Sequence, residues 1–114
     1  MSKPSDKLQQ ARSGDGETLA YNVTGNPSAL LRFALTHSLA LDHDFWAPVV
    51  AQLSAALGQE AAILTWDCRG HGQSSKPRQA YTVEQFAGDL ADLLDHLKWP
   101  DAILAGASMG GCIS

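Results

Sequence analysis

The chain has 114 residues, of which 45% are hydrophobic and 18% are charged, and its formal net charge at pH 7 is −4. These values are typical of one globular domain and exclude a disordered tail or a collagen-like repeat. The acidic balance argues against a nucleic-acid partner and against an anionic membrane surface, and no apolar run reaches the roughly 18 residues of a transmembrane helix. We expect a cytoplasmic protein, because the N-terminus carries no secretory signal and the two cysteines lack disulfide-framework spacing.

The sequence divides the chain into a short polar segment and a folded domain. Residues 1–12 are polar and predict a mobile lead-in, whereas residues 13–114 predict a single folded domain. The stretch 13–17 contains Asp-Gly, which supplies the positive φ of a tight turn and predicts a hairpin. Residues 18–24 alternate as a half-buried strand does, and residues 30–36 form a short apolar run typical of a buried strand.

A first helix is predicted between Asp44, as its N-cap, and Gly58, as its C-terminal stop. Pro48 falls in the first turn, where a missing N–H costs little. Apolar side chains recur at helical spacing and form one stripe, made of Trp46, Val49, Val50, Leu53 and Leu57. The stripe predicts that one face of this helix packs against a sheet.

The strand-then-helix order is then repeated. Residues 61–66 predict a second buried strand, and Thr82 with Gln85 forms a capping box that begins a second helix. The apolar face of this helix is made of Val83, Phe86, Ala87, Leu90, Leu94 and Leu97. The carboxylates expected toward its other side are Asp89, Asp92 and Asp95. Residues 101–106 predict a third buried strand, so the chain as a whole predicts an α/β fold with a mainly parallel sheet and flanking helices.

One pentapeptide carries chemistry, the G-x-S-x-G pattern of residues 106–110, which follows the third predicted strand without a gap. A serine on a sharp strand-to-helix turn exposes its hydroxyl, and glycines two residues before and after it avoid a Cβ clash. We predict Ser108 as a nucleophile, with the backbone N–H of Met109 directed at the oxyanion. The alternative interpretation is a glycine-rich turn with an incidental serine.

A second oxyanion donor is predicted after the first buried strand, where His37, Ser38 and Leu39 stand. We assign the donor role to the backbone N–H of Leu39 and expect the His37 side chain to brace this loop. The alternative there is a polar strand end with a solvated histidine. The remaining histidines, His43, His71 and His96, are not expected to act as the base.

Other polar residues are predicted to be structural. Asp67 and Arg69 are expected to hold their loop together, and neither cysteine is expected to be a nucleophile. No cofactor is predicted, since the chain has neither a dinucleotide-binding nor a phosphate-binding glycine motif. We also predict no metal site at residues 42–44, because three adjacent residues cannot all face one ion.

In this order, the motifs resemble the N-terminal half of an α/β-hydrolase, and they are most similar to the branch of 3-oxoadipate enol-lactonases and small carboxylesterases. The resemblance rests on the elbow and on three further stretches, residues 37–46, 67–74 and 81–86. One departure is His37-Ser38, where most of the superfamily has His-Gly. The resemblance implies a serine hydrolase of small carboxylic esters or lactones that forms an acyl-enzyme on Ser108.

The catalytic acid and histidine of this fold follow the nucleophile in sequence, and the chain ends six residues after Ser108. The resemblance therefore implies a triad completed by residues outside this chain. The alternative is a non-catalytic ligand-binding or interaction fragment of the same fold. In either case the strand before Ser108 lacks a partner on one edge, and such an edge favours self-association.

Overall fold

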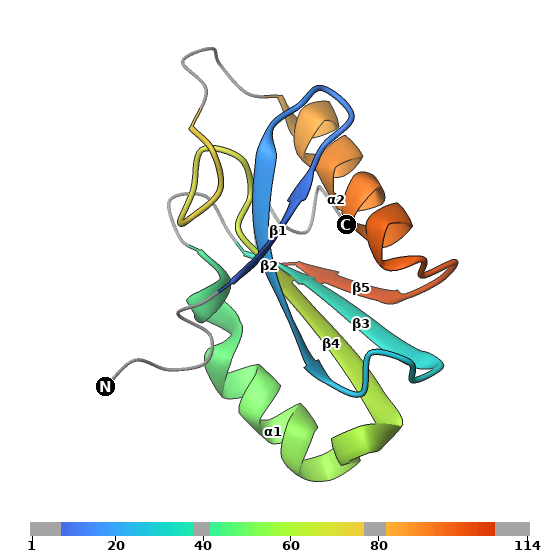
Figure 1. Ribbon diagram of the computed structural model, residues 1–114. Helices are drawn as coiled ribbons and strands as arrows, with labels where there is room; N and C mark the ends of the chain where they lie inside the picture. Colours follow the sequence, from blue (N-terminus) through green and yellow to red (C-terminus); the bar gives the residue numbers. More distant parts are fainter. Residues whose placement is uncertain (1–7, 38–41, 77–81, 107–114) are drawn as a thin grey trace.

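The computed structural model describes residues 8–37, 42–76 and 82–106. Within these ranges five strands form one sheet, and they are β1 (Gln9–Arg12), β2 (Thr18–Gly25), β3 (Leu31–Thr36), β4 (Ala61–Trp66) and β5 (Ile103–Gly106). The helices there are η2 (His43–Trp46), α1 (Ala47–Leu57), η3 (Gly58–Glu60) and α2 (Val83–Leu97), where η marks a 3-10 turn (Figure 1). None of these helices is long and apolar enough to cross a bilayer.

The sheet has the strand order β1-β2-β4-β3-β5. Strand β4 pairs in parallel with β3 and antiparallel with β2, while β5 is parallel to β3 on the other side. The predicted α/β fold is confirmed, and the sheet is mixed because the antiparallel pair β1–β2 precedes its parallel part. The register pairs Thr36 with Gly106, so β3 and β5 end side by side.

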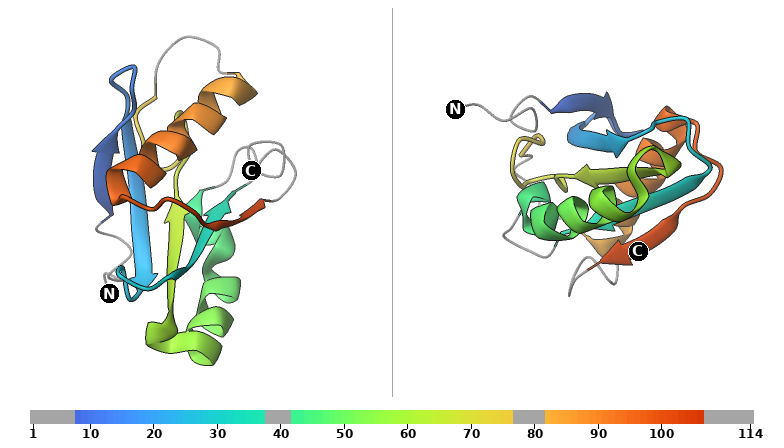
Figure 2. Two further views of the ribbon diagram at one scale, coloured as in Figure 1. Left: turned by 90° about the vertical axis from the view of Figure 1, so that its right-hand side faces the viewer. Right: turned by 90° about the horizontal axis from the view of Figure 1, so that it is seen from below.

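The two α-helices cover opposite faces of the sheet (Figures 1 and 2). Alternate side chains of β4 show this, because Leu64 and Trp66 pack in the same buried cluster as Phe86 of α2. Thr65, between them, instead lines a cavity with Val50 of α1. All six residues of β4 are buried, as expected for a strand with partners on both edges.

Helix α2 begins where the sequence predicts, but one carboxylate assigned to its polar side is buried. The Thr82 hydroxyl accepts from Gln85 N at 3.1 Å, and the Gln85 side chain accepts from Thr82 N at 3.0 Å. The prediction that Asp89 lies toward the polar side is wrong, since its side chain is buried and paired with Arg69. A carboxylate can replace an apolar residue on a packed face when a buried guanidinium neutralises it.

Helix α1 differs from the prediction at its start and along its apolar stripe. The capping side chain is Asp42 rather than Asp44, because Asp42 Oδ1 accepts from the backbone N–H of Asp44 at 3.0 Å and begins η2. Helix α1 follows η2, with proline in its first turn and Gly58, at φ 51°, at its end as predicted. No α1 residue is buried, and Val49 is 41% exposed, so the predicted stripe is only partly covered here.

Both ends of the described chain also differ from prediction. Residues 9–12, assigned to the polar lead-in, form β1 and pair with β2 through the predicted turn, in which Gly16 has φ 91°. Only Ala11 of β1 joins the core, so the segment carries almost no apolar signal. Strand β5 was predicted to be buried, but Ile103 is 52% exposed because β5 pairs only with β3 among the described residues.

Candidate active site

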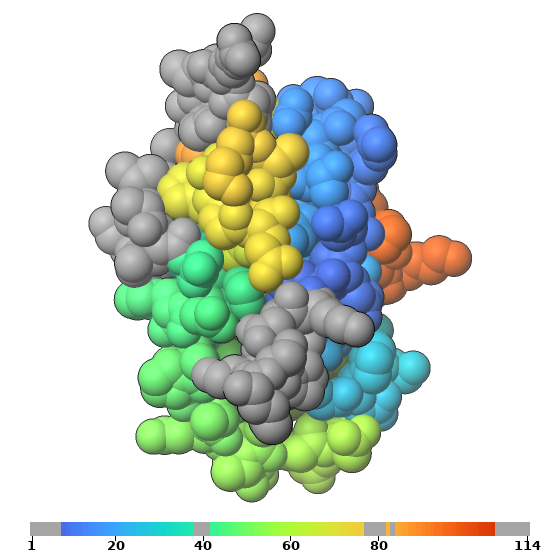
Figure 3. Space-filling view, turned by 60° about the vertical axis from the view of Figure 1, so that its left-hand side comes forward, coloured from blue at the N-terminus to red at the C-terminus, as the bar shows by residue number. Residues whose placement is uncertain are grey.

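The predicted chemistry belongs at the carboxyl ends of the parallel strands. Ser108, Met109 and Leu39 lie outside the described residues. The described residues at this edge of the sheet are His37 after β3, Gly106 at the end of β5, and the loop after β4. Figure 3 shows the exposed part of this loop (residues 67–76), in yellow, between the β1–β2 hairpin and η2.

Asp67, the first residue after β4, joins that loop to η2. Its Oδ1 accepts from the backbone N–H and from Nδ1 of His43, each at 2.8 Å, and its Oδ2 accepts from the backbone N–H of Gln73 at 2.8 Å. Burial alone raises the pKa of Asp67, but the hydrogen bonds outweigh it and hold the pKa below its ordinary value. The hydrogen bond between His43 Nδ1 and Asp67 Oδ1 also raises the pKa of His43. The expectation that Asp67 holds its loop together agrees with this geometry.

Two further residues of the loop complete the support of Asp67. Gly72 has φ 50°, and a Cβ there would lie 2.3 Å from Asp67 Oδ2, so only glycine permits this approach. The Ser74 hydroxyl donates to the carbonyl of Asp67 at 2.5 Å and accepts from the backbone N–H of Ala20 at 2.8 Å. Ser74 therefore connects the loop to β2.

Arg69 anchors the loop to α2. Its Nε and Nη2 each donate to the Asp89 carboxylate at 2.7 Å, and Nη2 also donates to Asp15 at 2.9 Å. The hydrogen bond to Asp89 raises the pKa of Arg69 above its ordinary value. Burial raises the pKa of Asp89, and the guanidinium opposes that shift. This pair spans 20 residues of sequence, which is why helical periodicity alone missed it.

Two buried histidines contact the backbone of the same loop. His37 Nε2 accepts from the backbone N–H of Cys68 at 2.9 Å, and His71 Nδ1 lies 3.0 Å from the carbonyl oxygen of Arg69. The two imidazole rings are 5.1 Å apart between centroids. His96 is exposed on α2 and contacts the Tyr21 ring. These contacts give His37 and His71 structural roles at the loop.

Cys68 is fully buried, and its thiol is unsuited to nucleophilic chemistry. Burial, with smaller contributions from the Asp89 and Asp67 carboxylates, raises the pKa of this thiol to about 12. The thiolate is the reactive form, so Cys68 is inert in the folded chain. Cys112 lies outside the described residues.

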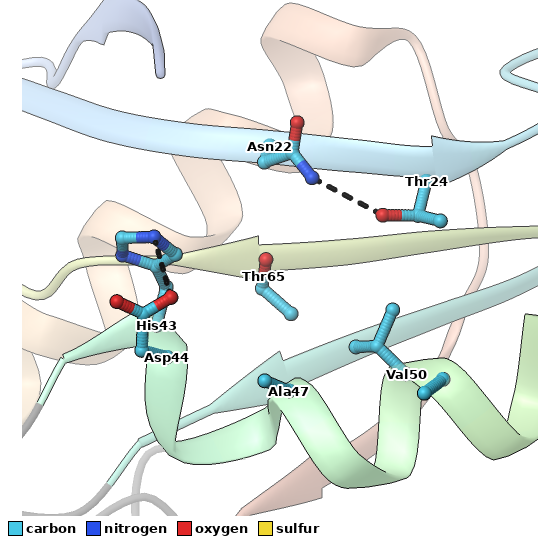
Figure 4. Close-up of a pocket in the computed structure, with 8 residues that line it drawn as sticks. Asn22, Thr24, His43, Asp44, Ala47, Val50 and Thr65 are labelled. Atoms are coloured by element: carbon cyan, nitrogen blue, oxygen red, sulfur yellow. Dashed lines mark hydrogen bonds and ion pairs between the residues drawn. The ribbon is translucent and has the colours of Figure 1, made fainter. Parts of the chain in front are cut away.

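A cavity of about 220 Å³ lies between α1 and the adjacent face of β2 and β4 (Figure 4). Its lining residues are Asn22, Thr24, His43, Asp44, Ala47, Val50, Ala51 and Thr65. They come from separate segments, so no sequence motif indicated the cavity. Its polar groups partly bind one another, with Asn22 Nδ2 donating to Thr24 Oγ1 at 3.1 Å and His43 Nε2 lying 3.3 Å from Asp44 Oδ1.

One group of side chains at this end has the composition of a metal site. The ligand atoms of Asp42, His43 and Asp67 lie within 4.8 Å of one another. However, Asp67 Oδ1 already accepts two hydrogen bonds from His43, and Asp42 Oδ1 accepts one from Asp44. We therefore interpret the group as a hydrogen-bonded network that positions η2.

Comparison with known proteins places the chain in a family. The sequence profile for the alpha/beta hydrolase fold matches residues 33–114. The chain is 36% identical over 96 residues to 3-oxoadipate enol-lactonase 1 of Acinetobacter baylyi, covering 84% of the chain and 34% of that relative.

Solved structures give the same result. The enol-lactonase of Burkholderia xenovorans is 37% identical with a TM-score of 0.82, and the match covers 92% of this chain and 39% of that one. A hydrolase of Pseudomonas aeruginosa is 34% identical with a TM-score of 0.82, and the match covers 94% of this chain and 38% of that one. The chain spans between a third and two fifths of the length of these relatives. These matches, together with the strand order and the loop after β4, show that the chain belongs to the α/β-hydrolase family. The chain forms the N-terminal part of that fold.

Proposed function

We propose that the chain is the N-terminal part of a serine hydrolase that cleaves small carboxylic esters or lactones. The observation that carries this proposal is the G-x-S-x-G pentapeptide that begins with Gly106, the last residue of β5. A nucleophile elbow requires this strand-then-turn position. Identity to 3-oxoadipate enol-lactonases supports a lactone or ester as the substrate class.

In the proposed mechanism, Ser108 attacks the carbonyl carbon of the ester or lactone. During this attack a histidine outside these 114 residues accepts the hydroxyl proton of Ser108, and the backbone N–H groups of Met109 and Leu39 stabilise the oxyanion. The histidine then donates that proton to the alkoxide oxygen as the carbon–oxygen bond of the ester or lactone breaks. The same histidine, oriented by an acid also outside the chain, then activates water, which releases the acyl group from Ser108. The contacts of His37 and His71 support a catalytic histidine outside these 114 residues, because each of the two binds the backbone of the loop after β4.

The test compares Ser108→Ala with Ser28→Ala in the complete protein. Ser28 lies on an exposed turn and provides the matched control. We expect Ser108→Ala to reduce the rate of aryl ester or enol-lactone hydrolysis by at least 10³-fold, on the order seen for loss of a nucleophile, and to abolish labelling by a fluorophosphonate. Ser28→Ala is expected to keep both properties. Retained hydrolysis in Ser108→Ala would contradict the proposal.

An interaction role for the same fold is the second candidate. It is favoured by the exposed apolar residues of β5, since Ile103 is 52% and Leu104 40% exposed on a strand that lacks an outer partner among the described residues. Such an edge can pair with another strand, including that of a second copy. Binding of a lactone without turnover, together with concentration-dependent self-association, would favour this second function.

A further inference from the structure

His37 occupies a special position between the ends of three strands. It directly follows Thr36, whose register partner on β5 is Gly106, the first residue of the pentapeptide. On its other side, the His37 side chain reaches the loop after β4, where Nε2 accepts from the backbone N–H of Cys68 at 2.9 Å. One fully buried side chain thus fixes β3 to β4 next to the place where β5 ends.

The hydrogen bond determines which tautomer the imidazole adopts. A backbone N–H can only donate, so Nε2 of His37 must carry a lone pair, and the neutral ring carries its proton on Nδ1. If both ring nitrogens were protonated, the Nε2–H group would face the Cys68 N–H, which would then lack an acceptor in a buried position. The contact therefore requires a neutral His37.

The neighbouring imidazole reinforces this arrangement. His71 Nδ1 lies 3.0 Å from the carbonyl oxygen of Arg69, and since a carbonyl only accepts, His71 Nδ1 carries a proton. The two rings, 5.1 Å apart between centroids, thus bind the backbone of adjacent loop residues. His37 accepts from the N–H of Cys68, and His71 donates to the carbonyl oxygen of Arg69. This backbone segment is held by two side chains whose tautomers are both fixed.

We infer that His37 is a positioning residue of the hydrolase, kept as the neutral Nδ1–H tautomer so that Nε2 fixes the end of β3 to the loop after β4. This inference rests on the proposed function, in which the N–H of Leu39, two residues further on, stabilises the oxyanion. An oxyanion donor acts only when it lies within hydrogen-bond distance of the developing charge. The hydrogen bond at Nε2 fixes the position of His37, which is the last described residue before that donor in the sequence.

The experiment compares His37→Gln with His37→Leu in the complete protein. Glutamine can place its side-chain oxygen near the position of Nε2 and accept from the Cys68 N–H, whereas leucine retains bulk but has no acceptor. We expect His37→Leu to lower kcat about 10- to 100-fold with little change in KM, because a displaced oxyanion donor affects the transition state most. His37→Gln is expected to recover kcat to within about fivefold of the wild type. His96→Gln, at an exposed position on α2, is the matched control and should leave kcat unchanged.

A second measurement reads the tautomer directly and requires no activity. Long-range ¹H–¹⁵N correlation spectra of ¹⁵N-histidine-labelled protein at pH 7.5 should show His37 with an unprotonated Nε2, assigned by loss of its signals in His37→Gln. A protonated Nε2 would overturn the inference, even if His37→Leu failed to fold. A folded His37→Gln protein as inactive as Ser108→Ala would also overturn it, because His37 would then take part in the reaction itself. Failure of the proposed function is seen separately, as retained hydrolysis in Ser108→Ala.

Discussion

Replacement of Asp67 by asparagine removes the charge at the centre of the described site while preserving its shape. Asp67 accepts three hydrogen bonds of 2.8 Å from His43 and Gln73 and is fully buried. In Asp67→Asn one oxygen becomes an NH₂ group, so a buried donor is left facing another donor, which costs about 1–3 kcal/mol. Loss of the charge-assisted bond adds about 1.5 kcal/mol, so we expect the free energy of unfolding to fall by about 3 kcal/mol.

The loss should depend on pH in a defined direction. The pKa of His43 is raised, so its contribution is complete below its unfolded value of about 6.5 and is lost as pH rises through the folded value. The pKa of Asp67 is lowered, so its contribution is present above its unfolded value of about 3.9 and is lost as pH falls through the folded value. The pair thus stabilises the fold most between about pH 4 and pH 6.5. The difference in stability between the wild type and Asp67→Asn should be larger at pH 5.5 than at pH 8.5.

Urea unfolding of the complete protein, followed by tryptophan fluorescence at both pH values, measures this difference. Asp101→Asn is the matched control, because the Asp101 side chain is 79% exposed and its ion pair with Arg32, at 3.3 Å, faces solvent. An exposed ion pair contributes at most about 1 kcal/mol. A destabilisation in Asp67→Asn no larger than in Asp101→Asn, or one that is the same at both pH values, would refute the reasoning.

Three further substitutions or modifications test the same loop. Gly72→Ala should destabilise the protein by about 3 kcal/mol, because its Cβ would meet a carboxylate oxygen at 2.3 Å, whereas Gly16→Ala, at φ 91° with open space around it, should cost only about 1 kcal/mol in the same urea assay. Arg69→Lys should lose about 2 kcal/mol of stability, since an ammonium cannot reproduce the two 2.7 Å bonds to Asp89, and thermal unfolding would detect the change. Cys68 should resist iodoacetamide at pH 8 in the native protein and react after denaturation, as intact mass would show, because its thiol is buried with a pKa of about 12.

The elements that could be predicted from sequence are those with local signals. The capping box of Thr82 and Gln85 places the start of α2 correctly, and Gly58 places the end of α1, because each signal acts within a few residues. The four-residue strand β1 was missed, since only Ala11 enters the core and pairing with β2 supplies the rest of its stabilisation. Short edge strands depend on hydrogen bonds to a neighbour that periodicity does not record.

The contacts of the site join residues that are far apart in sequence. For these contacts the sequence predicted which residues are structural but not which partners they bind. Asp67 and Arg69 were expected to hold their loop, but their partners were not identified. Asp67 binds His43 across 24 residues, and Arg69 binds Asp89 across 20. From the sequence, Asp89 is assigned to the polar side of α2, because an aspartate in a buried ion pair cannot be told from an exposed one by helical periodicity.

The loop after β4 and His37 should contribute to activity in separable ways. Asp67, Arg69 and Ser74 each bind a different neighbour, namely η2, α2 and β2, so the loop ties three parts of the fold together. Substitutions in the loop should therefore lower stability and activity in parallel, since the misfolded fraction loses both. His37 accepts from the backbone N–H of Cys68 beside the strand end that leads to the pentapeptide, so its replacement should reduce kcat more than its loss of stability explains. A plot of kcat against the free energy of unfolding across these variants should place the loop variants on one line and His37→Leu below it.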